Sequence, residues 1–215
     1  MKTIKSIIYA AVVSLAFIGS SEASTCPSES FDLRINSNFP AEVILHNRSR
    51  KELGAYLNEK ALLGYVTQGL TVVQYQSGFS AEYASRQLRD GSWCSRVKQL
   101  TIDFGLSDKP YIYIAREVAR GTCLYNEVMK HEYQHLNISK EMVNVGSRQL
   151  KIGLRNSLAV NGVRANTSSE AIRILEQNIT SSVDSITSQL YQIAETKNAM
   201  LDTPANYALL GRICR

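Results

Sequence analysis

The sequence predicts an α+β fold, in which a small antiparallel or mixed sheet with one helix precedes a long antiparallel helical hairpin. Two observations lead to this prediction. Short apolar–polar alternations in the first part of the chain, such as residues 31–35, are typical of half-buried strands. In the second part, apolar side chains recur at spacings of three and four, the pattern of a helix with one buried face: Ile172, Leu175, Ile179, Val183, Ile186, Leu190 and Ile193. We therefore expect a single domain over residues 24–215, strand-rich over 24–120 and helical over 121–215.

The strand-rich part is expected to contain five short strands and one helix. A capping box formed by Ser49 and Glu52 begins the helix, which is expected to run to about residue 63. The strands are expected at residues 31–35, 43–45, 70–75, 97–104 and 111–115. A turn at 107–110 separates the last two, so these are predicted to form an antiparallel hairpin that leads into the helical part.

The helical part is expected to consist of two long helices and a short final one. Thr122 can cap the first long helix, which is expected to run to about residue 159 and to bend or break at Gly146 or Gly153. Ser168 or Ser169 can cap the second. The two helices are predicted to pack against each other in opposite directions, since the connection between them is short.

The first 23 residues have the pattern of a secretory signal peptide, with a positive start, an apolar run over 7–18 and a small-x-small site at 21–23 that would be cut after Ala23. Cleavage would leave 192 of the 215 residues and lower the net charge from +5 to +4. An ordinary solvated surface with slightly more Lys and Arg explains this mild charge, which would also suit contact with anionic envelope polymers or lipid head groups. The sequence has no charge block or aromatic–basic interleaving of the kind that indicates nucleic-acid binding. The protein is therefore expected to be exported, to the periplasm or the medium.

Four cysteines, an even number in a chain that is expected to be exported, predict two disulfides. Three pairings are possible, and Cys94–Cys123 together with Cys26–Cys214 is the one we favour. The first would join the strands to the motif helix, and the second would join the two ends of the chain. No C-x-x-C spacing is present, so a cysteine zinc site or a thiol redox centre is not expected.

One motif carries the strongest chemical signal in the chain: His131-Glu132-Tyr133-Gln134-His135. Helical residues four apart lie on the same face, so His131 and His135 can bind one metal ion. Glu132 stands about 100° round the helix from His131, where it can take a proton from zinc-activated water. The motif therefore predicts a Zn²⁺ site with two histidine ligands and Glu132 as general base.

The residues around the motif indicate that the two histidines face the protein interior. Five apolar side chains lie within about 60° of the His131 direction on a helical wheel: Leu124, Val128, Ile138, Met142 and Val145. Tyr133 lies about 200° from His131, which places it outside the expected metal pocket. Buried histidines bonded to carbonyl groups are the structural alternative, but a glutamate at the position that the chemistry requires favours the metal site.

The stretch over residues 121–138 resembles the active-site helix of zincin metallopeptidases, and in particular that of uncharacterised bacterial exported proteins predicted to be zinc-dependent proteases. The resemblance covers about residues 95–145. It implies that His131 and His135 bind zinc, that Glu132 is the catalytic base and that the substrate is a peptide or protein. Metzincins, one group of this family, have a glycine and a third histidine after the motif, whereas this chain has Ile138 and Glu141.

The third protein ligand that a catalytic zinc site usually needs is left open by the sequence. Five side chains are candidates: Glu141, Glu195, Asp202, Tyr207 and His46. Glu141 would point away from the metal if the helix continues, and Glu195 falls off the apolar stripe of its helix. Asp202 and Tyr207 could return to the motif, because the Asp-Thr-Pro at 202–204 stops the second helix and allows a short last one to fold back.

Two other functions remain open at this stage. A non-catalytic exported envelope protein could use the helical hairpin as an interaction surface, although Glu132 would then have no chemical purpose. A zinc amidase acting on cell-wall peptides would use the same centre on another substrate. For the peptidase, the edge of the strand hairpin before the motif could hold an extended peptide by strand addition. The sequence does not indicate an oligomeric state.

Overall fold

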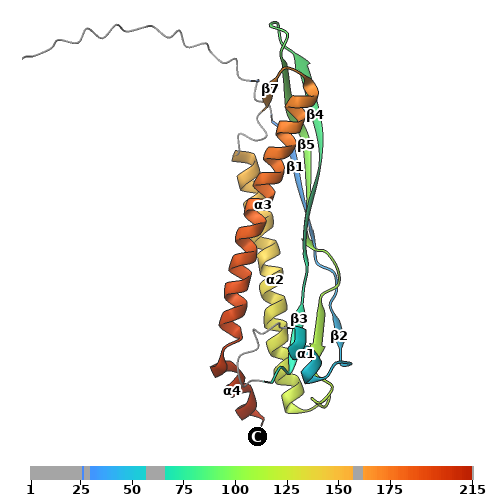
Figure 1. Ribbon diagram of the computed structural model, residues 1–215, viewed down its shortest axis with the longest axis vertical. Coiled ribbons are helices and arrows are strands. Elements are labelled where there is room, and N and C mark those ends of the chain that lie inside the picture. The colour runs from blue at the N-terminus through green and yellow to red at the C-terminus, as the bar shows by residue number, and fades with distance from the viewer. Residues whose placement is uncertain (1–25, 27–29, 57–65, 157–161, 215) are drawn as a thin grey trace, which may run out of the picture.

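Two mixed sheets run along one side of an elongated molecule, and two long helices run along the other (Figure 1). This arrangement comes from a computed structural model, which describes residues 26, 30–56, 66–156 and 162–214. The signal peptide expected at 1–23 lies outside the described residues. The α+β class is confirmed. Within the described residues, no helix is long and apolar enough to cross a membrane.

The larger sheet has the order β1-β5-β4, with β1 (Asp32–Asn38) parallel and β4 (Tyr75–Gln87) antiparallel to the central β5 (Trp93–Leu106). The short β7 (Val163–Ala165) pairs with the beginning of β5. Successive residues of a strand face opposite sides, so the apolar residues of β5 at alternate positions from Leu100 to Leu106 all point toward the helices.

The smaller sheet has the order β2-β6-β3, with β2 (Val43–Leu45) parallel and β3 (Gly69–Val72) antiparallel to β6 (Tyr111–Ile114). The expected hairpin between residues 97–104 and 111–115 is therefore wrong. After the turn at 107–110 the chain does not pair with β5. The Pro110 carbonyl instead accepts a hydrogen bond from the Val43 amide, and the residues after it pair with β2 and β3. The long strand β4 was missed, since its many Ser, Gly and Ala residues give only a weak alternation.

The helices begin largely where capping residues predict. Ser49 and Glu52 form the capping box of α1 (Arg50–Tyr56), and the rest of that expected helix lies outside the described residues. Thr122 accepts the Tyr125 amide at the start of α2 (Cys123–Asn156). Thr167, rather than Ser168 or Ser169, caps α3 (Ser168–Leu201). Thr203 caps the last helix, α4 (Pro204–Ile213), with Pro204 in its first turn.

The helices α2 and α3 form the expected antiparallel hairpin. The contact pairs run in opposite directions along the two helices: His135 meets Asn198, Glu141 meets Lys197 and Gly146 lies against Leu190. The helix α2 is continuous through Gly146 and Gly153, so it does not break at either glycine. A Cβ atom at Gly146 would stand only 2.4 Å from Phe104 Cε1 and 2.6 Å from Leu190 Cδ1, so the glycine allows close packing instead.

The buried apolar residues form two clusters. The larger cluster lies between the strands β1, β4 and β5 and the second half of α2 with the facing part of α3. It includes Phe104, Leu150 and Leu175. The smaller lies under the sheet β2-β6-β3, and joins Leu53 of α1 to Val128 and Leu136 of α2. The two clusters hold α2 along almost its whole length, so the motif residues at 131–135 lie on a firmly packed helix.

The expected number of disulfides, two, is confirmed, but the favoured pairing of the cysteines is wrong. Cys26 is bonded to Cys94, and Cys123 is bonded to Cys214. Cys94 begins β5 near β7, whereas Cys123 begins α2 at the opposite end of the molecule, so the two cannot meet (Figure 1). Two disulfides are typical of an oxidising, extracellular type of environment.

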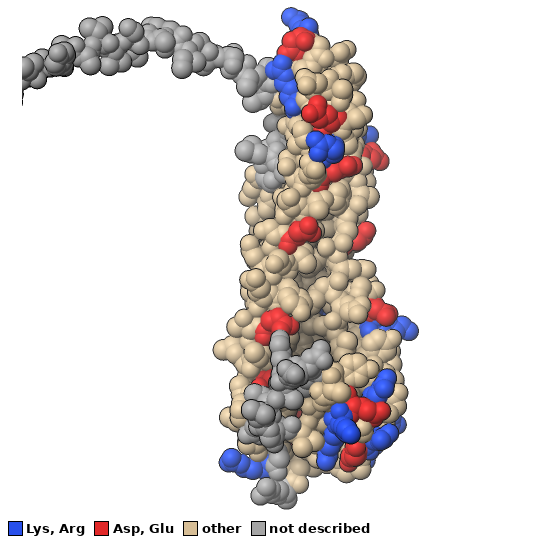
Figure 2. Space-filling view, in the orientation of Figure 1, with Lys and Arg blue, Asp and Glu red and all other residues tan. Residues whose placement is uncertain are grey.

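Figure 2 shows acidic and basic side chains intermingled near both ends of one face of the molecule, with a mostly uncharged stretch between them. Ion pairs such as Arg164–Asp90 and Arg116–Glu52 join charges of opposite sign among the described residues. This face therefore does not carry a field of a single sign.

Candidate metal centre

Three side chains, two from α2 and one from the end of α3, converge on one point. His131 and His135 project from the same face of α2, as their spacing predicts. Asp202, the C-cap residue of α3, lies opposite them. Its Oδ1 atom is 3.1 Å from Nε2 of each histidine, and the two Nε2 atoms are 3.2 Å apart. The three potential ligand atoms thus form a nearly equilateral triangle.

This triangle has the dimensions of one face of a metal coordination sphere. Ligand atoms about 2.0–2.1 Å from a tetrahedral zinc ion stand roughly 3.3 Å from one another. The separations of 3.1 and 3.2 Å are close to that value. The His131, His135 and Asp202 group can therefore hold a metal ion with little movement of the chain.

The orientation of His135 supports this use of its Nε2 atom. Its other ring nitrogen, Nδ1, is 2.9 Å from the amide oxygen of Asn198 on α3, which can only accept a hydrogen bond. Nδ1 must then carry the proton, and in the neutral ring Nε2 presents a lone pair toward His131 and Asp202. Such an outer hydrogen bond is how proteins commonly orient a metal-binding histidine.

Asp202 reaches the centre because α3 ends there. The Asp202 amide closes the last turn of α3 by donating to the Asn198 carbonyl, and Thr203 then starts α4. Tyr207 on α4 donates its hydroxyl to Asp202 Oδ1 at 2.8 Å. Burial alone would raise the pKa of Asp202, but its hydrogen bonds to His131, His135 and Tyr207 outweigh burial and hold that pKa well below its usual range.

The histidines and the aspartate differ in exposure. The side chains of His131 and His135 are 7% and 12% exposed, whereas that of Asp202 is 40% exposed. The centre is therefore enclosed by α2 and open on the side of Asp202. A site of this kind has walls that exclude water from the histidines and one side from which a ligand can approach.

Glu132 is buried between α2 and β3. Its Oε2 accepts a hydrogen bond of 2.8 Å from the Thr71 hydroxyl, and a Cβ atom on Gly69 would stand 2.5 Å from its Oε1. Gly69 is thus a glycine because the carboxylate occupies the space beside it. Desolvation raises the pKa of Glu132, while the charges of His135 and His131 and the Thr71 hydrogen bond lower it, with burial the stronger influence.

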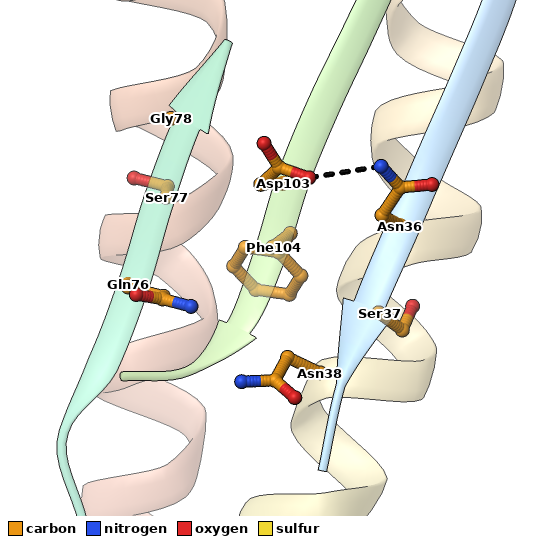
Figure 3. A pocket seen from close by; sticks show the side chains of 8 residues that line it. All are labelled: Asn36, Ser37, Asn38, Gln76, Ser77, Gly78, Asp103 and Phe104. Atoms are coloured by element: carbon orange, nitrogen blue, oxygen red, sulfur yellow. Dashed lines mark hydrogen bonds between the residues drawn. The ribbon is translucent and has the colours of Figure 1, made fainter. Parts of the chain in front are cut away.

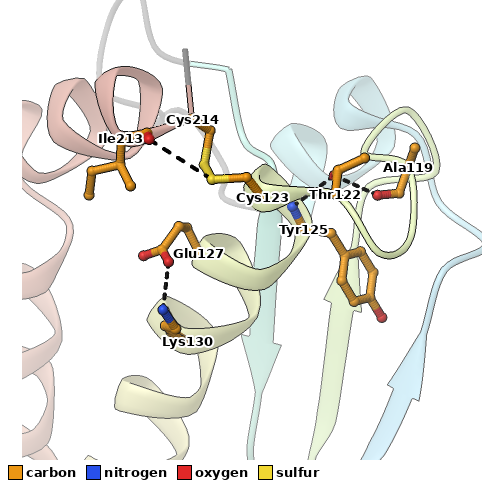
Figure 4. Close-up of a disulfide and its surroundings, with 8 residues drawn as sticks. All are labelled: Ala119, Thr122, Cys123, Tyr125, Glu127, Lys130, Ile213 and Cys214. Carbon is orange, nitrogen blue, oxygen red and sulfur yellow. Dashed lines mark hydrogen bonds and ion pairs between the residues drawn. A yellow bond between two sulfur atoms is a disulfide. The ribbon is translucent and has the colours of Figure 1, made fainter.

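The disulfide Cys123–Cys214 joins the beginning of α2 to the end of α4 (Figure 4). Cys123 lies two turns before His131, and Cys214 follows the helix that carries Tyr207. None of the described residues of α4 is fully buried, so apolar packing contributes little to its position. The disulfide is therefore a main reason that α4 lies beside the centre.

Of the other four candidate ligands, three lie outside this group of side chains and Tyr207 contacts Asp202. Glu141 forms an ion pair with Lys197 at 2.7 Å, and His46 Nε2 is 2.8 Å from the Val118 carbonyl oxygen. Glu195 is not part of the metal-binding group. The hydroxyl of Tyr207 donates to Asp202, so Tyr207 supports a candidate ligand in place of being one itself. Tyr133 points away, as expected, and its hydroxyl donates to Glu42.

Comparison of the chain with protein-family models, with curated proteins and with solved structures finds no match in any of the three. The resemblance to the zincin helix therefore rests on the motif alone, and the function has to be argued from the geometry of this site.

Sequence reasoning missed three residues that shape the centre: Asn198, Thr71 and Gly69. Asn198 lies on the α3 face that meets α2, where a polar side chain in an apolar stripe was the available signal. Thr71 and Gly69 carry no signal of their own, because their role depends on β3 packing against Glu132.

Proposed function

We propose that the protein is an exported zinc-dependent hydrolase, and specifically a metallopeptidase. The observation that carries the proposal is the convergence of His131, His135 and Asp202 beside the buried Glu132. Three protein ligands next to a carboxylate that is not one of them are typical of catalytic rather than structural zinc sites. The two disulfides support work in an oxidising compartment outside the cytoplasm.

The donor set favours zinc over other common ions. Two imidazole nitrogens and one carboxylate oxygen suit Zn²⁺, whereas Mg²⁺ and Ca²⁺ prefer oxygen ligands only. Three protein ligands leave one position of a tetrahedral ion open. When bound, zinc supplies a Lewis acid that makes water a stronger nucleophile and polarises a carbonyl group.

The remaining chemistry belongs to Glu132. In its charged form the carboxylate can take the proton of the attacking water and then pass it to the leaving amine. A pKa above the usual carboxyl range makes it a better base near neutral pH. Thr71 holds one carboxylate oxygen in place, which fixes the orientation of the base.

The peptide substrate is proposed from the neighbouring strand. Among the described residues, β3 pairs only with β6, so its other edge has unpaired backbone groups. The same strand contacts Glu132 through Gly69 and Thr71. An extended peptide that pairs with this edge would pass close to the base and the metal ligands. The free edge of β3 thus takes the peptide-binding role that the sequence assigned to the hairpin of residues 97–104 and 111–115, which does not form.

The proposal is tested by metal analysis and peptide hydrolysis on the oxidised protein. We expect about one zinc per chain in the wild type. His131→Ala should lose the metal, while Glu132→Gln should keep it and lose hydrolysis by at least about a hundredfold. His46→Ala is the matched control, since this histidine bonds to a backbone carbonyl away from the centre and should retain both properties.

Each alternative gives a different result in the same experiment. Wild-type protein that binds no zinc contradicts the hydrolase. Zinc binding without hydrolysis of peptides or cell-wall fragments favours the non-catalytic envelope protein. Hydrolysis of cell-wall peptides but not of a protein substrate favours the amidase.

A further inference from the structure

A polar hollow lies on the side of the larger sheet that faces away from the helices (Figure 3). Its volume is about 520 Å³, within the range of small-molecule sites. Two rows of side chains cross the three strands here. Asn36, Asp103 and Gly78 are in register in one row, and Asn38, Gly105 and Gln76 in the next.

Glycine at two of these six positions creates the hollow. A Cβ atom on Gly78 would meet nothing within 4 Å, so the space above β4 is open. At Gly105 a Cβ atom would stand 2.5 Å from the Asn38 carbonyl oxygen, which leaves no room for a side chain between the strands. Larger side chains at these positions would fill the depression that the amide and carboxylate groups now surround.

The polar groups in the hollow are partly fixed and partly available. Asn36 donates to Asp103 Oδ1 at 2.9 Å, and Asn38 donates to the Leu106 carbonyl oxygen at 3.0 Å. These bonds orient the two asparagines. Within the described part of the chain, the Gln76 amide and the second carboxylate oxygen of Asp103 have no hydrogen-bond partner and can bond to a ligand.

The chemistry of the lining restricts the ligand. It includes no lysine or arginine, and Asp103 would repel an anion. Its one large apolar side chain, Phe104, is only 2% exposed, so an apolar ligand would gain little. One carboxylate with amide oxygens is a weak set for a divalent cation. Amides both donate and accept, and a carboxylate accepts, which together match the hydroxyl and acetamido groups of a sugar.

We propose that this hollow binds a neutral oligosaccharide that carries hydroxyl and acetamido groups. The site is separate from the metal centre. Ser37, next to the hollow, bonds to Ser147 on α2 at 2.7 Å, and Ser147 lies twelve residues beyond His135, which is about 18 Å along the helix. The inference does not depend on the proposed hydrolase activity.

Titration of the oxidised protein with chitotetraose, followed by NMR or calorimetry, tests the proposal. Binding to the wild type is expected in the millimolar range, as for few and exposed hydrogen bonds. Asp103→Ala should weaken it about tenfold, because hydrogen bonds to a charged group are lost. Gly78→Gln should abolish it by filling the hollow. Ser80→Gln is the matched control, since it is exposed two residues along the same strand and outside the hollow.

Failure of wild-type protein to bind, or equal binding by Gly78→Gln and Ser80→Gln, overturns the proposal. So does a titration with calcium chloride in which the ion alone binds at Asp103. Zinc content and peptide hydrolysis, measured on the same samples, should not change in Gly78→Gln. Wild-type protein that contains no zinc or hydrolyses no peptide would contradict the proposed function. The result of the sugar titration would still stand, because it does not depend on that activity.

Discussion

The two halves of the α2–α3 hairpin show how one pair of helices supports two kinds of packing. Around Gly146 the helices and the larger sheet enclose an apolar core, and Phe104 and Leu190 approach α2 closely. Around His131 and His135 the same face of α2 meets polar side chains instead. Apolar packing is not directional, whereas the polar half needs particular atoms at particular places. Helical periodicity therefore indicates which face of a helix is buried, but not whether that face forms an apolar core or a polar site.

The largest expected effect concerns Asp202. Asp202→Ala should weaken zinc binding by at least about a hundredfold, because it removes one of three ligands. It should also destabilise the metal-free protein below about pH 9, because the side chain, although 40% exposed, is the ion-pair partner of His135. Competition with a chelator measures the zinc affinity. Glu141→Ala, on the outer side of α2 and paired with Lys197, is the control. Equal zinc affinities of the two variants would remove Asp202 from the centre.

The second largest effect concerns the two disulfides. Both close loops of similar length, so loss of either should destabilise the protein by about 2–5 kcal/mol. Only the double substitution Cys123→Ser with Cys214→Ser should also weaken zinc binding, by about tenfold, because α4 and Tyr207 lose their attachment to α2. Cys26→Ser with Cys94→Ser is the matched control. Chelator competition on folded protein that shows the same affinity in both variants would contradict the role given to the second disulfide.

A smaller effect is expected in the apolar half. Gly146→Val should destabilise the fold by about 1–3 kcal/mol, because its side chain would overlap Phe104 and Leu190. Folded Gly146→Val should still bind zinc normally. Gly153→Ala is a milder control, since a Cβ atom there would stand 3.4 Å from Ile186. Urea denaturation measures both, and a variant at 146 as stable as the wild type would show that the core is loosely packed there.

The smallest effect is the pH dependence of the metal-free protein. Burial lowers the pKa of His135, but its hydrogen bonds to Asp202 and Asn198 outweigh burial and raise the pKa to about 9, from 6.5. The resulting stability is fully present below pH 6.5 and is lost as the pH rises to about 9. The melting temperature of protein treated with a chelator should fall by a few degrees over this range. Asp202→Asn should show a weaker fall, and an equal fall in both would contradict this ion pair.

Much of the local structure was predictable because it depends on neighbours in the chain. The helix limits followed from Ser49, Thr122 and the Asp-Thr-Pro at 202–204, and the histidine pair followed from the geometry of a single helix turn. Strand pairing was not predictable in the same way. The strands at 97–104 and 111–115 join different sheets, because each has a parallel partner 60 or more residues earlier, in β1 or β2, besides its antiparallel partner in β4 or β3.

Local sequence patterns were sufficient to predict the α+β class, the two long helices, the number of disulfides and the placement of His131, Glu132 and His135 on one helix. The contact of Asp202 with the two histidines and the bond between Cys123 and Cys214 depend on the packing of whole helices, so they required the structure. The physical reason is that helix geometry relates residues a few positions apart, while Asp202 stands 67 residues from His135. Contacts at that separation depend on how α3 and α4 pack against α2, which no local pattern specifies.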